Sequence, residues 1–172
     1  MKSANTLSKL LVLATLFFGL VWSPGPSVMA YANKTLDLEF VAAGGGPPDV
    51  TVLGDGTVIF KITVTQSVSG DLSGTLTEAI TQVFPASEEE GLLPITTFWK
   101  LETADGTMEG YYSGKFRHLS DGSHAITQHG EVLSVTGDYV DFYQAEVSYR
   151  AALGADHMTI AGALTIHQVN RR

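Results

Sequence analysis

The chain contains no cysteine. Without thiols it forms no disulfide bonds, and thiol catalysis, thiolate metal sites and iron–sulfur clusters are all excluded. The fold must therefore rely on packing and hydrogen bonds alone. A chain of 172 residues is long enough to bury a core without covalent staples.

Positive charge is also scarce. The sequence has 10 Lys and Arg residues against 18 Asp and Glu residues, which gives a formal net charge of −8. An acidic chain with few, scattered basic residues repels phosphate backbones, so we predict that it does not bind nucleic acid. The closing pair, Arg171 and Arg172, is too small a cluster to change this expectation.

Long hydrophobic runs are limited to Leu10–Val21 near the start of the chain. This run is about 12 residues, whereas about 20 are needed to span a bilayer. It follows the basic residues Lys2 and Lys9, and two small-residue cleavage patterns, which end at Ala30 and Ala32, come after it. These features are typical of a secretory signal peptide, and the length disfavours the alternative of an uncleaved membrane anchor.

We therefore predict a signal peptide in residues 1–32 and one mature domain in residues 33–172. The protein is expected to be secreted or periplasmic, with no stable membrane insertion after cleavage.

Helical periodicity is lacking in the mature domain. No segment longer than ten residues has apolar residues at i, i+3 and i+4. Thr, Val, Ile, Phe and Tyr dominate instead, and turn residues recur at intervals of about 10–15 residues, which is typical of all-β folds. The pattern predicts strands at residues 34–42, 49–53, 57–68, 71–84, 95–104, 107–118, 123–136, 140–152 and 156–168.

The turns between these strands indicate the architecture. Asp105-Gly106 and Asp121-Gly122 are strong signals for tight hairpins. Long strands joined by tight turns form either a two-sheet sandwich or a closed barrel. Near-equal strand lengths favour a single antiparallel up-and-down barrel of about eight strands. The longest break, residues 85–94, is interpreted as either a lid or a simple connection.

The segment Glu109–His118 (EGYYSGKFRH) illustrates the alternation of faces. One face carries Gly110, Tyr112, Gly114 and Phe116, and the other is polar, which predicts a half-buried strand. The two glycines leave room beside Tyr112 for a ligand or for a bulky neighbour such as Trp99.

Polar residues on otherwise apolar faces are the candidate functional residues. Glu78 and Gln82 share a face with Leu76 and Ile80. A carboxylate is costly to bury, so Glu78 must be paired, protonated or close to a wet cavity.

Two interpretations of these residues remain open. In the first, an apolar pocket is lined by a few directional groups, with Glu78 or His124 as general acid or base. The ligand-binding residues would then be Trp99, Tyr112, Tyr143, Tyr149, Gln82 and Gln128. In the second, Glu78 lies at a barrel rim, and the tyrosines are core residues with satisfied hydroxyls.

No metal or cofactor site is predicted. The separations of six and five residues between His118, His124 and His129 mix the two strand faces, with His124 and His129 on opposite ones, and no HExxH motif is present. A hydrolase is disfavoured because the G-x-S-x-G elbow is missing.

Three segments resemble the late strands of allene oxide cyclase-like barrels, a superfamily that includes dirigent proteins and some bacterial polyketide cyclases. They are GTMEGYYSGKF (106–116), HGEVLSVTGDYVDFYQAEVSYRAAL (129–153) and MTIAGALTIH (158–167). Asp138 and Val140 stand where that family's pattern usually has glycine. The resemblance implies an eight-stranded barrel whose interior holds a hydrophobic small molecule.

Our leading hypothesis is an exported barrel that binds a small, largely apolar ligand, either as a carrier or as a cyclase or isomerase. The alternative is a structural or protein-interaction barrel whose core is packed solid. A homo-oligomer is compatible with both.

Overall fold

The computed structural model describes residues 34–43, 45–87, 92–156 and 159–169. The predicted signal peptide lies outside these residues, as does part of the 85–94 loop. Within them the chain forms nine strands and one 3-10 helix: β1 (Thr35–Ala43), β2 (Asp49–Val52), β3 (Val58–Gly70), β4 (Gly74–Phe84), β5 (Leu92–Thr103), β6 (Gly106–His118), β7 (His124–Val135), η1 (Gly137–Phe142), β8 (Glu146–Leu153) and β9 (Thr159–His167).

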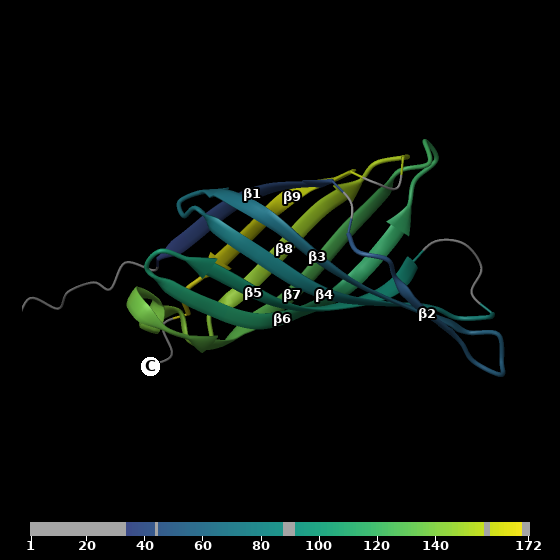
Figure 1. Cartoon of the computed structure of the whole chain (residues 1–172), viewed down its shortest axis with the longest axis horizontal. Coiled ribbons are helices and arrows are strands. Elements are labelled where there is room, and N and C mark those ends of the chain that lie inside the picture. The colour runs from purple at the N-terminus through teal and green to yellow at the C-terminus, as the bar shows by residue number, and fades with distance from the viewer. Residues whose placement is uncertain (1–33, 44, 88–91, 157–158, 170–172) are drawn as a thin grey trace, which may run out of the picture. The chain divides into compact units, whose positions relative to one another are not determined.

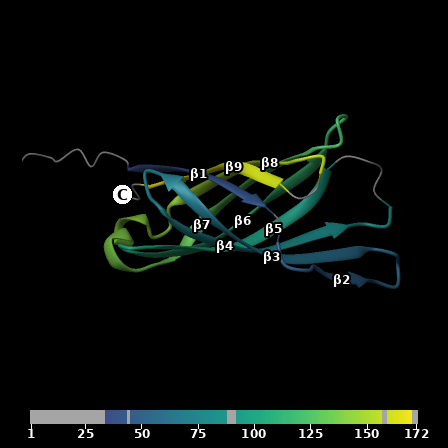
Figure 2. The same ribbon diagram turned by 45° about the horizontal axis from the view of Figure 1, so that its top comes forward.

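The strands form a closed antiparallel barrel (Figure 1). Hydrogen-bonded neighbours follow the order β1-β9-β8-β7-β6-β5-β4-β3, and pairing between β1 and β3 closes the ring of eight. The turned view in Figure 2 shows β1 and β9 on one side of the interior and β4 to β6 on the other. The predicted all-β, up-and-down barrel of about eight strands is therefore confirmed.

The closing seam shares one edge of β3 between two strands. β1 pairs with Val68–Gly70 over three residue pairs, and β2 pairs with Val58–Lys61 at the other end of β3. Pro47 and Pro48 lie between β1 and β2, and proline cannot donate to a strand ladder. The chain therefore leaves the barrel wall here, and β2 forms a hairpin with β3 that extends from the ring (Figure 1).

Alternation along each strand sends every second side chain into the barrel. The half of the interior nearest η1 is packed solid by side chains with 0% exposure: Leu38, Leu76, Leu101, Met108, Val132, Leu164 and Ile166. η1 lies at this end of the barrel, between the end of β7 and the start of β8 (Figure 1). The core thus occupies the barrel itself rather than a separate layer.

The prediction of a strand at residues 140–152 is wrong over its first part. Gly137–Phe142 forms η1 instead, and β8 begins only at Glu146. Tyr139 and Phe142 are both buried, and their spacing of three residues matches one turn of a 3-10 helix. The Tyr139 hydroxyl also lies 2.6 Å from Thr103 Oγ1, which ties the helix to the end of β5.

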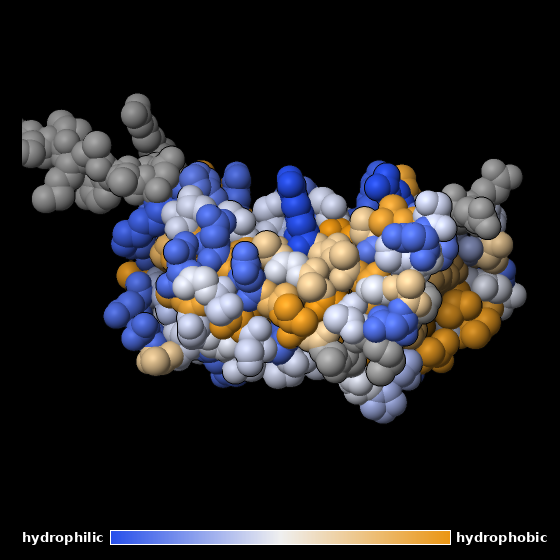
Figure 3. Space-filling view, turned by 90° about the horizontal axis from the view of Figure 1, so that it is seen from above, coloured by the Kyte–Doolittle hydropathy of each residue, from blue (hydrophilic) through white to orange (hydrophobic). Residues whose placement is uncertain are grey.

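The outer wall is mostly polar, with hydrophobic side chains gathered in a few places. On the face drawn in Figure 3 they are most extensive toward the right-hand end, where β2 lies in Figure 1. Exposed residues of that kind include Val50, Val52 and Leu53 on and beside β2. Within the described part of the chain, no helix has the length and apolar character needed to cross a membrane.

Candidate ligand-binding site in the barrel interior

A buried carboxylate lies in the middle of the barrel. Glu78 extends inward from β4 and is only 1% exposed. Gln66 of β3 donates through Nε2 to Glu78 Oε2 over 2.5 Å, and the Tyr112 hydroxyl of β6 donates to Oε1. One donor thus comes from β3, which neighbours β4 on one side, and the other comes from β6, which lies beyond β5 on the other side. Glu78 is therefore paired and lies away from either rim.

Burial sets the protonation behaviour of this group. Removal from water raises the pKa of Glu78 to about 7, and the hydrogen bond from Tyr112 works in the opposite direction. Burial, followed by the charge of Glu78, also raises the pKa of Tyr112 and of Tyr149, so both remain neutral phenols. Glu78 therefore exchanges a proton near neutral pH while its tyrosine neighbours do not.

A row of stacked rings fills the barrel beside this carboxylate. Phe40, Tyr149, Tyr112 and Trp99 follow one another with ring centroids 5.2, 4.8 and 6.2 Å apart. A Cβ atom added to Gly110 would lie 2.7 Å from Trp99 Cζ2, so the space left by this glycine is taken by the indole. Of the two occupants expected beside Tyr112, the bulky neighbour is the one present.

Gln128 belongs to the same packed layer. Its side chain is 1% exposed, and Nε2 donates to Thr97 Oγ1 over 3.2 Å and to the Tyr112 carbonyl over 3.4 Å. These bonds join β7 to β5 and β6 across the interior. Gln128 therefore holds the layer together and does not face an open space.

The end of the barrel opposite η1 is not filled. A cavity of about 150 Å³ remains where β3 begins and β4 ends. An engineered cavity of similar volume lined by Leu, Ile and Phe stays dry and binds benzene. The lining residues described here are Gly45, Phe60, Ile62, Val64, Ile80, Gln82, Ile95, Phe116, Ile126, Leu153 and Ile160.

Gln82 is the one polar side chain among these described lining residues. It is 6% exposed, and its Nε2 atom has no hydrogen-bond partner in the structure. A buried amide without a partner is uncommon in folded proteins, because no hydrogen bond offsets the free-energy cost of removing the donor from water. The cavity thus combines an apolar wall with a single unused donor.

His124 lies behind this wall. Its ring packs against Phe116 in a tilted arrangement with the ring centroids 4.4 Å apart, and Phe116 itself lines the cavity. His124 Nε2 is 2.8 Å from Nδ1 of His118, across the β6–β7 hairpin, whereas His129 is exposed. Among the residues the structure describes, no three His, Asp or Glu side chains gather as metal ligands would.

The structure places the predicted site residues in four different surroundings. Glu78, Trp99, Tyr112, Tyr149 and Gln128 are together in the packed middle layer. The others are Gln82, which lines the cavity, His124, which is buried behind it, and Tyr143, which is 57% exposed after η1 and joins neither.

Two kinds of residue were missed by sequence reasoning. Gln66 was overlooked as the partner of Glu78, although continuing the alternation of Ile62 and Val64 by one step would have placed it inside. The aliphatic residues that line the cavity were not predicted to border an empty space, because no sequence signal separates a filled stretch of barrel from an empty one.

Comparisons with known proteins support the fold alone. No protein-family model matches the chain, and neither does any curated protein. The chain is similar to the crystal structure of a conserved protein of unknown function from Rhodopseudomonas palustris, with a TM-score of 0.54 and 17% identity over 81% of this chain and 99% of that chain. What the two share is a barrel. The resemblance to allene oxide cyclase-like proteins stays a prediction.

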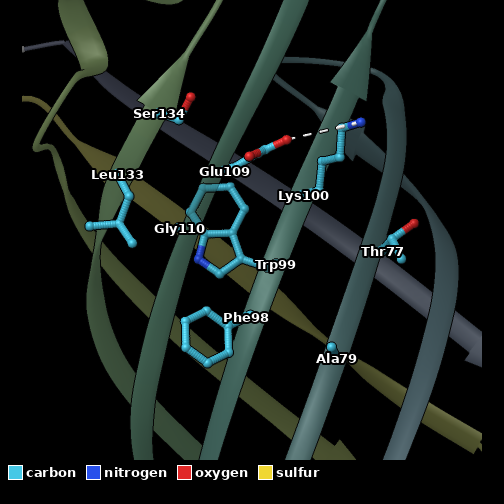
Figure 4. Close-up of a pocket in the computed structure, with 9 residues that line it drawn as sticks. All are labelled: Thr77, Ala79, Phe98, Trp99, Lys100, Glu109, Gly110, Leu133 and Ser134. Atoms are coloured by element: carbon cyan, nitrogen blue, oxygen red, sulfur yellow. Dashed lines mark ion pairs between the residues drawn. The ribbon is translucent and has the colours of Figure 1, made fainter.

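The outer wall of the barrel in the present protein carries a separate hollow. It has a volume of about 310 Å³ and lies where a bulge at Glu109/Gly110 interrupts the β6–β7 ladder. Figure 4 shows Phe98 and Leu133 beside Trp99, with the ion pair between Lys100 and Glu109 at the edge. The paired atoms are 4.0 Å apart and both side chains are partly exposed, so this ion pair contributes little to the stability of the fold.

Proposed function

We propose that the protein binds a small, largely apolar molecule inside the barrel, in the cavity beside Gln82. The observation that supports the proposal is an apolar space of about 150 Å³ lined by inward-facing side chains of the barrel. Binding sites for small molecules are typically apolar hollows with a few placed polar groups. The pattern of Leu10–Val21 and the residues after it further suggests that the protein acts outside the cytoplasm.

Catalysis is the second candidate, as a cyclase or isomerase of a hydrophobic molecule. It is favoured by the pKa of Glu78, about 7, which suits a general acid or base, and by the resemblance to allene oxide cyclase-like barrels. Against it, both carboxylate oxygens already accept hydrogen bonds from Gln66 and Tyr112, and Glu78 does not line the cavity. We therefore place binding first.

The isoleucines offer a direct test. The chain has seven, and five of them line the cavity. Ile166 lies in the packed end near η1, and Ile59 alternates to the outer face of β3. With the Ile δ1 methyls labelled with ¹³C, titration with toluene should shift the signals of the five lining residues: Ile62, Ile80, Ile95, Ile126 and Ile160.

Ile166 and Ile59 are the internal references and should stay in place. A titration that moves no methyl, or that moves all seven alike, would refute binding in this cavity. The variant Ile160→Trp places an indole against the space and should abolish the shifts. Its matched control, Val52→Phe, adds a ring to exposed β2 and should leave them unchanged.

A further inference from the structure

We infer that the molecule bound in the cavity is neutral and carries an oxygen atom that accepts a hydrogen bond from Gln82 Nε2. This inference rests on the proposed function and names the chemical class of its ligand. A ketone, an ester or an ether of about six to nine non-hydrogen atoms fits a cavity of about 150 Å³, by analogy with benzene in a cavity of that volume.

The donor is the first reason. Gln82 lies near the end of β4, where its ladder neighbours are Phe60 and Ile95, and both of these line the cavity. Gln82 is 6% exposed, and its Nε2 atom has no partner. The hydrogen-bonding capacity of this nitrogen is therefore unused within the described chain. An oxygen atom of the ligand would satisfy it without rearranging the wall.

The lack of charge among the described lining residues is the second reason. None of the described residues that line the cavity is ionisable. A carboxylate or phosphate would enter an apolar space with one neutral donor, and burying an unpaired charge is far more costly than burying a neutral oxygen. The described part of the wall therefore selects a neutral acceptor over an acidic one.

The donor also affects selectivity. A ligand of the same shape without an acceptor leaves the amide unpaired, and sites built around a hydrogen bond discriminate strongly against such analogues. Cyclohexanone and methylenecyclohexane form a matched pair, because they differ only in a C=O group against a C=CH₂ group. The ketone is better hydrated in water, so the informative quantity is the ratio of the two dissociation constants compared between variants.

The experiment compares the wild type with Gln82→Leu, which keeps the bulk of the side chain and removes the donor. Both probes are titrated while the Ile δ1 methyls are followed. The ratio of the Kd for the ketone to the Kd for the alkene should rise about tenfold in the variant. In the wild type alone, the infrared C=O stretch of bound cyclohexanone should lie below its frequency in an apolar solvent.

The outcomes separate the two proposals. If both probes shift the five cavity methyls but the ratio is unchanged, or the stretch keeps its apolar value, the cavity binds and the acceptor inference is overturned. Gln82 would then be satisfied by water. If neither probe nor toluene shifts those methyls, the proposed function fails and the inference fails with it. The infrared measurement needs no variant, so a misfolded Gln82→Leu leaves the test intact.

Discussion

Replacing the buried carboxylate with an amide should remove a large part of the pH dependence of stability. Glu78 is 1% exposed, and burial raises its pKa from 4.5 to about 7. Between these values the folded protein holds a proton that the unfolded chain has released. Stability from this group is therefore fully present below pH 4.5 and is lost as the pH rises through 7.

The magnitude follows from the same two values. One pKa unit corresponds to about 1.4 kcal/mol, so a rise from 4.5 to about 7 amounts to about 3 kcal/mol. This is a large share of the 5–15 kcal/mol that typically holds a domain of this size together. In Glu78→Gln the amide oxygen still accepts from Tyr112, and no charge appears at high pH.

Urea unfolding of the wild type and of Glu78→Gln at several pH values between 4 and 8 measures this effect. The stability of the wild type should fall by about 3 kcal/mol more than that of the variant across this range. All other ionisable groups are common to both proteins, so the difference isolates Glu78. The exposed substitution Glu39→Gln is the matched control and should follow the wild type. If the wild type and Glu78→Gln run parallel, Glu78 is already charged in the folded protein at neutral pH and the reasoning is wrong.

The remaining predictions concern the same interior. Tyr112→Phe removes the hydrogen bond that lowers the pKa of Glu78, so the pH window of the stability loss should move upward in the same urea series; an unmoved window would mean that Tyr112 does not stabilise the charged form. Gly110→Ala places a Cβ atom 2.3 Å from Glu131 O and should cost about 1–3 kcal/mol in thermal or urea unfolding, whereas Gly46→Ala, with no atom within 4 Å of its added Cβ, should stay within about 0.5 kcal/mol. Equal effects of the two glycine substitutions would show that the atoms around Gly110 shift at little cost to accommodate a Cβ atom.

The sequence by itself determined which side chains enter the barrel. Leu76, Glu78, Ile80 and Gln82 were assigned to one face by alternation, and all four face the interior. This assignment succeeds because the period of two is a local property of the extended backbone and needs no knowledge of neighbouring strands. The same pattern, with tight turns and near-equal strand lengths, was sufficient to predict a closed barrel.

Alternation failed where the backbone stopped being extended. Tyr143 was placed inside with Tyr149, but η1 intervenes before β8 and leaves Tyr143 exposed. The burial of Tyr139 and Phe142 against the end of the barrel outweighed the β-propensity of the segment. That contact exists only after the barrel has formed.

Tertiary structure alone decided what each inward residue does. Glu78 meets Gln66 and Tyr112, while Gln82, on the same strand and face, meets a cavity and no partner. The difference arises from the register of eight strands and from the volumes of their inward-facing side chains. Large side chains fill one end of the barrel, and the other end is left open. Side-chain direction is set by the local chain, but whether a space is filled depends on every strand that surrounds it.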